Sequence, residues 1–409
     1  MTDTVQRESL RAANRQMTIF LGALLATILL AVVLPDLVPP AARSAAADLF
    51  HARVLSVTQP GPQSQGAQPS AVDPGTGSAG PGTDGGGAGE PIEAVVEFLD
   101  GPNAGKQGQA IVQGPSGSLQ LPDYGVGDEV VVEVDTSPDG TASMIVVDRW
   151  RLPLLETLVA LLAVAAAAVA GWRGLRAIVA LALTLVLTLR LFVPLVILGW
   201  NPVALAIVFG ILVTTLSFML TQGLNRTSLA AIAGTTLGLG ITGLLAAIVT
   251  AAAAFTPAQG SDQVVYLSQL TNSSIDLSGL LLAAVIFGGL GVLNDVAISQ
   301  AVTVEELHLA NPKLTAGQLF GRSMNVGASH LAATINTLVF AYLGTALPLV
   351  VLIVLQISNM AATASEEGIA VEVVRTVVGV LGVLAAVPIT TAIAALSVAA
   401  SVAPSSEGA

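Results

Sequence analysis

Long apolar runs separated by short polar stretches dominate the chain after residue 150. A helix needs about 20 mostly apolar residues to cross a bilayer, and several of these runs reach that length. The pattern therefore predicts a multi-helix transmembrane domain at 151–403. One span, 346–360, is short and contains Pro348, so we expect it either to span the membrane or to re-enter it. The predicted spans are 153–171, 175–199, 202–221, 227–255, 277–303, 324–344, 346–360 and 374–400.

A further apolar run at 17–38 predicts a ninth span near the N-terminus. Its apolar part of about 18 residues exceeds the roughly 7–15 residues of a secretory signal, so we favour an uncleaved signal anchor over a cleaved signal peptide. Three arginines precede the run: Arg7, Arg11 and Arg15. By the positive-inside rule they predict that residues 1–16 form a cytoplasmic tail.

Between residues 48 and 150 the pattern changes to short alternating runs, which are typical of strands. The runs are "FHARVLSVT", "IEAVVEFLD", "KQGQAIVQG", "DEVVVEVDT" and "ASMIVVDRW", and turn signals separate most of them. Five such strands predict a small OB- or SH3-like barrel, with an irregular β-sandwich as the alternative. After a signal anchor with its N-terminus inside, this β domain is expected to be extracytoplasmic. Residues 59–90 are Gly-, Pro- and Ser-rich and predict a disordered linker within it.

Composition supports a membrane protein. Hydrophobic residues make up 53% of the 409 residues and charged residues only 10%, which is too little charge for the surface of a soluble protein of this size. The expected fold is therefore an α-helical polytopic membrane protein, with about eight to nine transmembrane helices and a small all-β domain. The net charge of −12 argues against a nucleic-acid partner.

Enzyme motifs are missing from the sequence. The absence of cysteine excludes disulfides, Cys-ligated zinc sites and thiol nucleophiles. Three histidines occur without an HExxH motif, and there is no GxSxG elbow or P-loop. An aspartyl protease needs two carboxylates that share a proton, whereas only one aspartate is well placed within a span. We predict no catalytic residues, no metal site and no cofactor.

Four segments resemble the YibE/F-like family of bacterial membrane proteins, with a likeness that extends from about residue 90 to 400. The resemblance implies a multipass protein of the bacterial inner or plasma membrane with an extracytoplasmic β domain. It implies no settled activity. The segments are "GLNRTSLAAIAGTTLGLGITGLL" (223–245), "IDLSGLLLAAVIFGGLGVLNDVAIS" (275–299), "NVGASHLAATINTLVFAYLGTALPL" (325–349) and "VEVVRTVVGVLGVLAAVPITTAIAAL" (371–396).

Polar residues within the span 277–303 form the first candidate site. Asp295 follows Asn294 and lies about ten residues, or roughly 15 Å, from the cytoplasmic boundary at Glu305. A carboxylate at this depth costs at least a few kcal/mol if it faces lipid. The spacing predicts that one helix face carries Asp295 and Ser299 together with two glycines, Gly288 and Gly291, which would let another helix approach.

The next span repeats the pattern. Its path candidates are Asn325, Ser329, His330, Asn336 and Thr337. An earlier span contains "GTTLG", in which Gly234 and Gly238 form a small-xxx-small motif that predicts close helix packing.

Arg190 is the cation that lies well inside a span, about 15 Å from Trp200 at the expected outer interface. In a bilayer core of about 30 Å, Arg190 and Asp295 then lie at matched depth, which predicts that they pair. Three interpretations stay open for Asp295: a static ion pair or polar clasp, a substrate or proton site, and exposure to a water-filled vestibule.

Two functions follow from these patterns. The first is a permease or exporter of a small anionic solute, with Arg190 as the anion contact and Asp295 as a release switch or proton partner. The second is a non-transporting scaffold whose β domain binds an envelope component. Nine spans with polar stripes favour transport, because an anchor needs only one. The bilayer is the expected surrounding, and the sequence predicts neither the substrate nor the oligomeric state.

Overall fold

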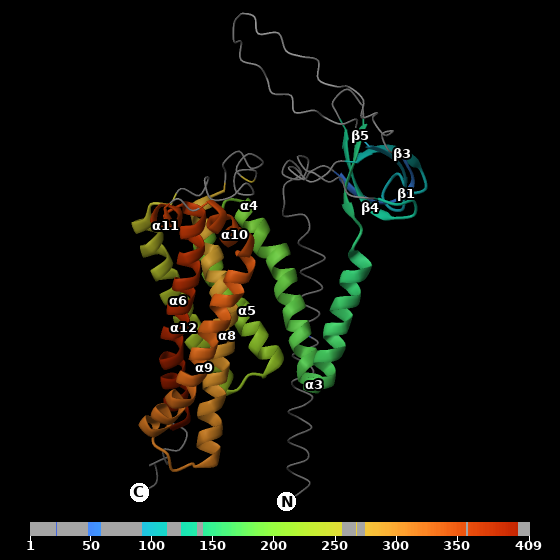
Figure 1. Ribbon diagram of the computed structural model, residues 1–409. Coiled ribbons are helices and arrows are strands. Elements are labelled where there is room, and N and C mark those ends of the chain that lie inside the picture. Colours follow the sequence, from blue (N-terminus) through green and yellow to red (C-terminus); the bar gives the residue numbers. More distant parts are fainter. Residues whose placement is uncertain are drawn as a thin grey trace, which may run out of the picture. The chain divides into compact units, whose positions relative to one another are not determined.

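The structure is a computed structural model of the whole chain (Figure 1). The residues that it describes are 22, 48–58, 92–112, 124–136, 142–255, 267, 275–356 and 359–399. The chain divides into two units, each described by itself below: Arg43–Leu162 is one, and Met1–Ala42 with Ala163–Ala409 is the other.

The first unit contains a closed five-stranded barrel with the strand order β1-β2-β3-β5-β4. Strands β3 and β5 pair in parallel, and all other neighbours pair antiparallel. The predicted barrel is thus confirmed over the sandwich, and its closed Greek-key order fits the OB type. The strands are β1 (Asp48–Thr58), β2 (Ile92–Phe98), β3 (Gln107–Val112), β4 (Glu129–Thr136) and β5 (Ala142–Arg149).

Alternation along the strands builds the interior of the barrel, because successive side chains point to opposite faces. Val54, Val96 and Val132 are fully buried there, and Phe98 packs edge-on against Phe50. Every buried side chain that the structure describes in the barrel is aliphatic or aromatic. The predicted linker 59–90 connects β1 with β2 and lies outside the described residues, as do the predicted tail 1–16 and anchor 17–38.

Six helices among the described residues are long and apolar enough to cross a membrane, fewer than the eight or nine predicted. Two predicted spans, 153–171 and 175–199, are joined in one helical run, Leu152–Ile197. The predicted span 346–360 contains α10 (Leu347–Gln356), whose ten residues rise about 15 Å, half the thickness of a bilayer core. A helix of that length does not span the bilayer.

The run Leu152–Ile197 is interrupted at Gly171, where φ is 58° and ψ is −138°. This backbone conformation is open to glycine and strained for other residues. The chain reverses direction there (Figure 1), and a Cβ atom at Gly174 would overlap the carbonyl of Ala166. The expected pair of spans is therefore present as two arms of one interrupted helix. The run consists of α3 (Leu152–Leu187), the π-helix η2 (Thr188–Phe192) and α4 (Val193–Ile197).

The remaining long helices form a bundle (Figure 1). Helices α6, α8 and α12 pack against one another, α5 packs against α6 and α8, and α9 packs against α8 and α12. A short helix, α11 (Met360–Ala364), precedes α12. The bundle helices are α5 (Pro202–Thr221), α6 (Arg226–Ala253), α8 (Leu277–Ala310), α9 (Ala316–Thr345) and α12 (Glu367–Ala399).

Side-chain caps set where the bundle helices begin. Asn201, Asn225 and Asp276 each accept a hydrogen bond from a backbone N–H in the first turn of α5, α6 and α8. Helix α9 begins with a capping box formed by Thr315 and Gln318. These caps satisfy backbone donors that the helix itself leaves unpaired.

Three aromatic rings join η2 to the bundle. The ring centroid of Phe192 lies 5.4 Å from that of Phe209 on α5 and 4.7 Å from that of Phe287 on α8. Because Arg190 is two residues before Phe192, this cluster fixes the position of the π-helical turn that carries the arginine.

Candidate functional site

Helix α8 makes polar contacts with three neighbouring helices. In each, a threonine hydroxyl of the neighbour donates to a side-chain oxygen of α8. Such bonds between membrane helices are worth roughly 0.6–2 kcal/mol each. The contacts are Thr214 (α5) to Asn294 at 2.8 Å, Thr391 (α12) to Gln300 at 3.0 Å and Thr227 (α6) to Glu305 at 2.5 Å.

Asn294, which was predicted as a path residue, is thus engaged with α5. Gln300 was not predicted, although its position carries a signal: it follows the buried Leu293 and Val296 by seven and four residues. That spacing puts a polar side chain on the inward face of the helix. Because Asn294 and Gln300 bond to neighbouring helices, the remaining path candidates on α8 are Asp295 and Ser299.

Asp295 points the other way and is exposed at the surface of the bundle, while Ser299 one turn later is half-buried. Arg190 is exposed as well. Neither Asp295 nor Arg190 forms an ion pair with any residue that the structure describes. The pairing predicted from their matched depth is therefore absent from this arrangement. Matched depth is insufficient for pairing, because the two side chains must also point toward each other.

The two glycines beside Asp295 differ in their surroundings. A Cβ atom at Gly288 would come within 2.5 Å of the Tyr342 hydroxyl, so α9 approaches α8 closely there. No atom lies within 4 Å of the corresponding point at Gly291. The helix face of Asp295 is thus closed by α9 at one end and open beside the carboxylate.

The predicted candidates on α9 mostly point away from the bundle. Asn325, Ser329, Asn336 and Thr337 are exposed, and His330 is half-buried. The Thr337 hydroxyl donates to a backbone carbonyl of its own helix. The side of α9 that faces the bundle carries Leu319, Ser323, Gly327 and Leu338.

Glycines permit close contacts between α6 and α12. A Cβ atom at Gly234 would overlap the Thr390 hydroxyl, and one at Gly382 would overlap the Thr242 hydroxyl. At Gly238 it would come within 3.0 Å of both Ala386 and Leu293. The small residues of "GTTLG" therefore lie where α6 meets α8 and α12, as small residues do where membrane helices approach closely.

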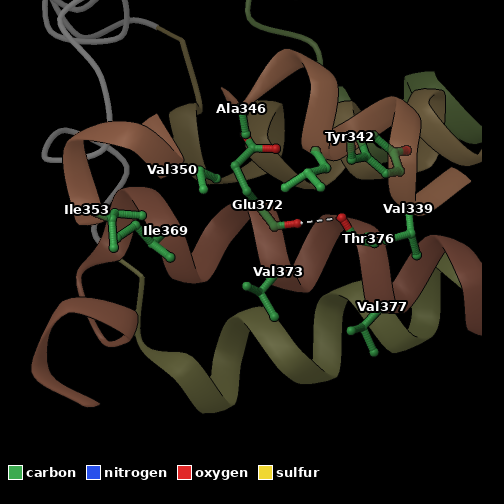
Figure 2. Close-up of a pocket in the computed structure, with 11 residues that line it drawn as sticks. Val339, Tyr342, Ala346, Val350, Ile353, Ile369, Glu372, Val373, Thr376 and Val377 are labelled. Carbon is green, nitrogen blue, oxygen red and sulfur yellow. Dashed lines mark hydrogen bonds between the residues drawn. The ribbon is translucent and has the colours of Figure 1, made fainter. Parts of the chain in front are cut away.

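Figure 2 shows a cavity of about 230 Å³ between α9, α10 and α12. Its walls are mainly aliphatic, with Tyr342 at one end and Glu372 and Thr376 along α12. Arg375 donates to the Glu372 carboxylate at 2.7 Å. No predicted path residue lines it. An aliphatic cavity within a membrane protein suits an apolar group better than a polar solute.

Polar contacts also gather on the outside of the barrel. The rings of His51 and Trp150 are stacked with centroids 4.0 Å apart, and His51 Nε2 lies 3.1 Å from a Glu129 carboxylate oxygen. A hydrogen bond from Arg53, helped by the one with His51, holds the pKa of Glu129 below its usual value. Burial raises the pKa of the Tyr124 hydroxyl.

No group of three or more His, Asp or Glu side chains that could hold a metal ion occurs among the described residues. Among the predicted path residues that the structure describes, Asp295 and Arg190 are the two charged ones, and both are exposed. Both residues can be named from the sequence, but the direction of their side chains cannot, since that direction depends on which helices pack around them.

Comparisons with known proteins place the helical part of the chain in a family. The profile of the YibE/F-like protein family matches residues 158–400, more than half of the chain. Comparisons with curated proteins and with solved structures gave no match. The matched range begins in α3 and ends with α12, so the likeness predicted for the β domain lies outside it. The chain belongs to the YibE/F-like family of proteins.

Proposed function

We propose that this multipass membrane protein is a permease for a small solute, with Asp295 as the central group of its path. The observation that carries the proposal is the exposed carboxylate of Asp295 on α8, which has no ion-pair partner among the described residues. Even on the lenient insertion scale an aspartate near the middle of the bilayer costs about 2.5–3.5 kcal/mol. Such a residue faces water or a polar ligand, and intramembrane carboxylates of this kind mark ion and substrate paths.

Arg190 suggests the solute class. It is exposed in the π-helical turn η2 and has no ion-pair partner among the described residues. A guanidinium always carries its charge and binds carboxylate and phosphate groups with two parallel hydrogen bonds. An anionic solute would contact Arg190, and protonation of Asp295 would couple its binding to its release.

The first experiment tests water access. The chain has no cysteine, so Asp295→Cys is a single thiol in an otherwise unreactive protein. We expect a membrane-impermeant maleimide to label it in native membranes. Leu244→Cys on α6, an exposed position of an apolar span, is the control and should stay unlabelled. If neither variant is labelled, the carboxylate does not face water.

The second experiment tests flux. Proteoliposomes with a panel of small anions (formate, acetate and phosphate) should show uptake that Asp295→Asn and Ser299→Leu abolish at normal protein level. Glu306→Gln changes another exposed carboxylate, at the end of α8, and should transport normally. Equal uptake in all variants and in empty liposomes would rule out this path.

The non-transporting scaffold is the second candidate, and the closed barrel favours it, because OB-type barrels are binding modules. It predicts a barrel that binds an envelope component and helix variants without a functional effect. The two functions share one topology, with the N-terminus in the cytoplasm and the barrel outside the bacterial plasma membrane. Protease added to intact spheroplasts should therefore cut within residues 59–90, and cutting only after lysis would reverse the topology.

A further inference from the structure

Helix α9 is both polar and poorly covered by other helices, a combination that is unfavourable if lipid surrounds it. It is the least hydrophobic of the six candidate spans, and it is also the least covered. Only 11% of the residues in its most apolar part are buried in the bundle, against 28–50% in the other five. A helix that faces lipid is normally the more apolar one, because lipid offers no hydrogen-bond partners.

The uncovered side of α9 has the periodicity of a helix–helix contact. Asn325, Ser329, Ala332 and Asn336 follow one another at intervals of four, three and four residues, and all four are exposed. This spacing puts them on one stripe, the seam along which two helices cross at a shallow angle. The seam ends at Asn336, because Val339 and Leu343, the next positions at this spacing, line the cavity between α9, α10 and α12.

Residues on the seam are suited to contact another helix. Serine and alanine let two backbones approach closely, and asparagine is one of the side chains that hydrogen-bond across membrane helices. Exposed to lipid instead, the amide of Asn336, twelve residues inside the span predicted to begin at residue 324, would lack partners for its two donors and its carbonyl. The seam therefore requires a protein partner.

We propose that this partner is α9 of a second copy of the chain, packed about a two-fold axis along the membrane normal. In such a contact each residue meets its own counterpart at the same depth. Like charges would then oppose one another, and the seam residues from Asn325 to Asn336 carry none. An asparagine amide both donates and accepts, so it can pair with its own copy. The face is self-complementary.

Contacts on the other side of α9 leave this seam free. Gly327 packs against Gln300 of α8, and Tyr342 lies against Gly288. Gly327 lies on the side of the helix opposite Asn325 and Asn336, and Tyr342 lies roughly a third of a turn from both. The dimer is independent of the proposed transport, because a scaffold could associate in the same way and a permease could act as a monomer.

Single-cysteine cross-linking in native membranes tests the dimer, since the chain contains no cysteine of its own. Ser329→Cys and Asn336→Cys place a thiol on the seam. Mild oxidation should shift most of each variant to twice the 41.2 kDa mass of the chain. The controls are Val208→Cys on α5 and Leu244→Cys on α6, two exposed positions outside the seam, which should stay at the monomer mass.

Three outcomes would overturn the proposal. Equal cross-linking at the controls would mean random collision. A product at another mass would mean that a different protein covers α9. The monomer mass at every position would mean that lipid or another part of the same chain covers it.

A second pair of variants separates the seam from general damage to α9. In the Ser329→Cys background, Asn336→Leu removes an amide from the seam and should lower the cross-linked fraction. Thr337→Leu changes the neighbouring exposed residue, whose hydroxyl only bonds its own helix, and should leave that fraction unchanged. An equal effect of both substitutions would contradict the proposed seam. Anion uptake measured on the same samples reports the transport proposal separately.

Discussion

Helices α9 and α12 both pack against α8, but their polar residues lie in different surroundings. Half of the most apolar part of α12 is buried in the bundle, and its Thr390 and Thr391 are fully buried. Only 11% of the corresponding part of α9 is buried, and its Asn325 and Asn336 are exposed. The two threonines of α12 therefore lie inside the bundle, whereas the two asparagines of α9 lie outside it.

An exposed polar residue has a different meaning in a membrane protein than in a soluble one. In water, exposure of an asparagine is ordinary, but in a bilayer an exposed amide loses its hydrogen-bond partners. Polar residues of α12 form contacts within the chain, as Thr391 does with Gln300. The exposed asparagines of α9 then indicate contacts beyond the chain. Substitutions of inward-facing and of outward-facing residues test this difference between α12 and α9.

The largest effect is expected where α6 meets α12. Gly382→Leu places a side chain where even a Cβ atom would overlap the Thr242 hydroxyl. Overpacking typically costs about 1–3 kcal/mol. The cost at this site is at or above the upper end, because the fully buried, β-branched Thr242 side chain would have to be displaced. We expect a strongly lowered melting temperature, measured by size-exclusion chromatography of heated, detergent-solubilised protein.

Gly240→Leu is the matched control, since no atom lies within 4 Å of the position of its Cβ. Leucine has a better helix propensity than glycine by up to about 1 kcal/mol, so this variant should be as stable as the native protein or more stable. If both substitutions destabilise the protein equally, the tight contact between α6 and α12 is not the cause.

A medium effect is expected at the hydrogen bond between α8 and α12. Gln300→Leu removes the acceptor of the Thr391 hydroxyl, which keeps its bond to the Val387 carbonyl. The loss should be about 0.6–2 kcal/mol, the range for such bonds between membrane helices. Asn336→Leu, on the exposed side of α9, should leave the stability of the detergent-solubilised monomer unchanged. Equal destabilisation by both would remove the distinction between inward and outward polar residues.

Much of the architecture could be predicted from the sequence, because hydrophobic periodicity reflects the surroundings of each segment. The five strands, the barrel and most spans of the helical domain occur near their predicted positions. The count among the described residues is lower for three reasons. The range 346–360 contains only a ten-residue helix, the two helices that meet at Gly171 count as one run, and the expected anchor 17–38 lies outside the described residues.

The candidate site was less predictable. Periodicity correctly places Asp295 and Ser299 on one side of α8, but it does not tell which helix covers that side. The predicted pairing of Asp295 with Arg190 therefore has no counterpart in the structure. Contacts such as Thr214 with Asn294 join residues 80 positions apart in the chain, and such pairs follow from packing rather than from spacing.

The smallest effect is expected in water, on the barrel, where Glu129 accepts hydrogen bonds from Arg53 and His51. These contacts lower the pKa of Glu129 in the folded state. The carboxylate therefore stabilises the barrel at a pH above its unfolded pKa, and this contribution is lost as the pH falls through the folded pKa. Glu129→Gln should be slightly less stable at neutral pH and equal to the native protein in acid.

The effect should be small because exposed ion pairs contribute little in water. Acid unfolding can be followed by the fluorescence of Trp150, which stacks on His51, in a protein whose Trp172 and Trp200 are replaced by phenylalanine. Glu93→Gln, an exposed carboxylate on β2 without an ion pair among the described residues, is the control. A large difference in stability between Glu129→Gln and Glu93→Gln at neutral pH would mean that exposed polar contacts stabilise the barrel as much as buried polar contacts stabilise the bundle. Such a result would contradict the difference expected between the barrel in water and the interior of the helical bundle. That difference requires a polar contact to contribute more to stability where water is absent.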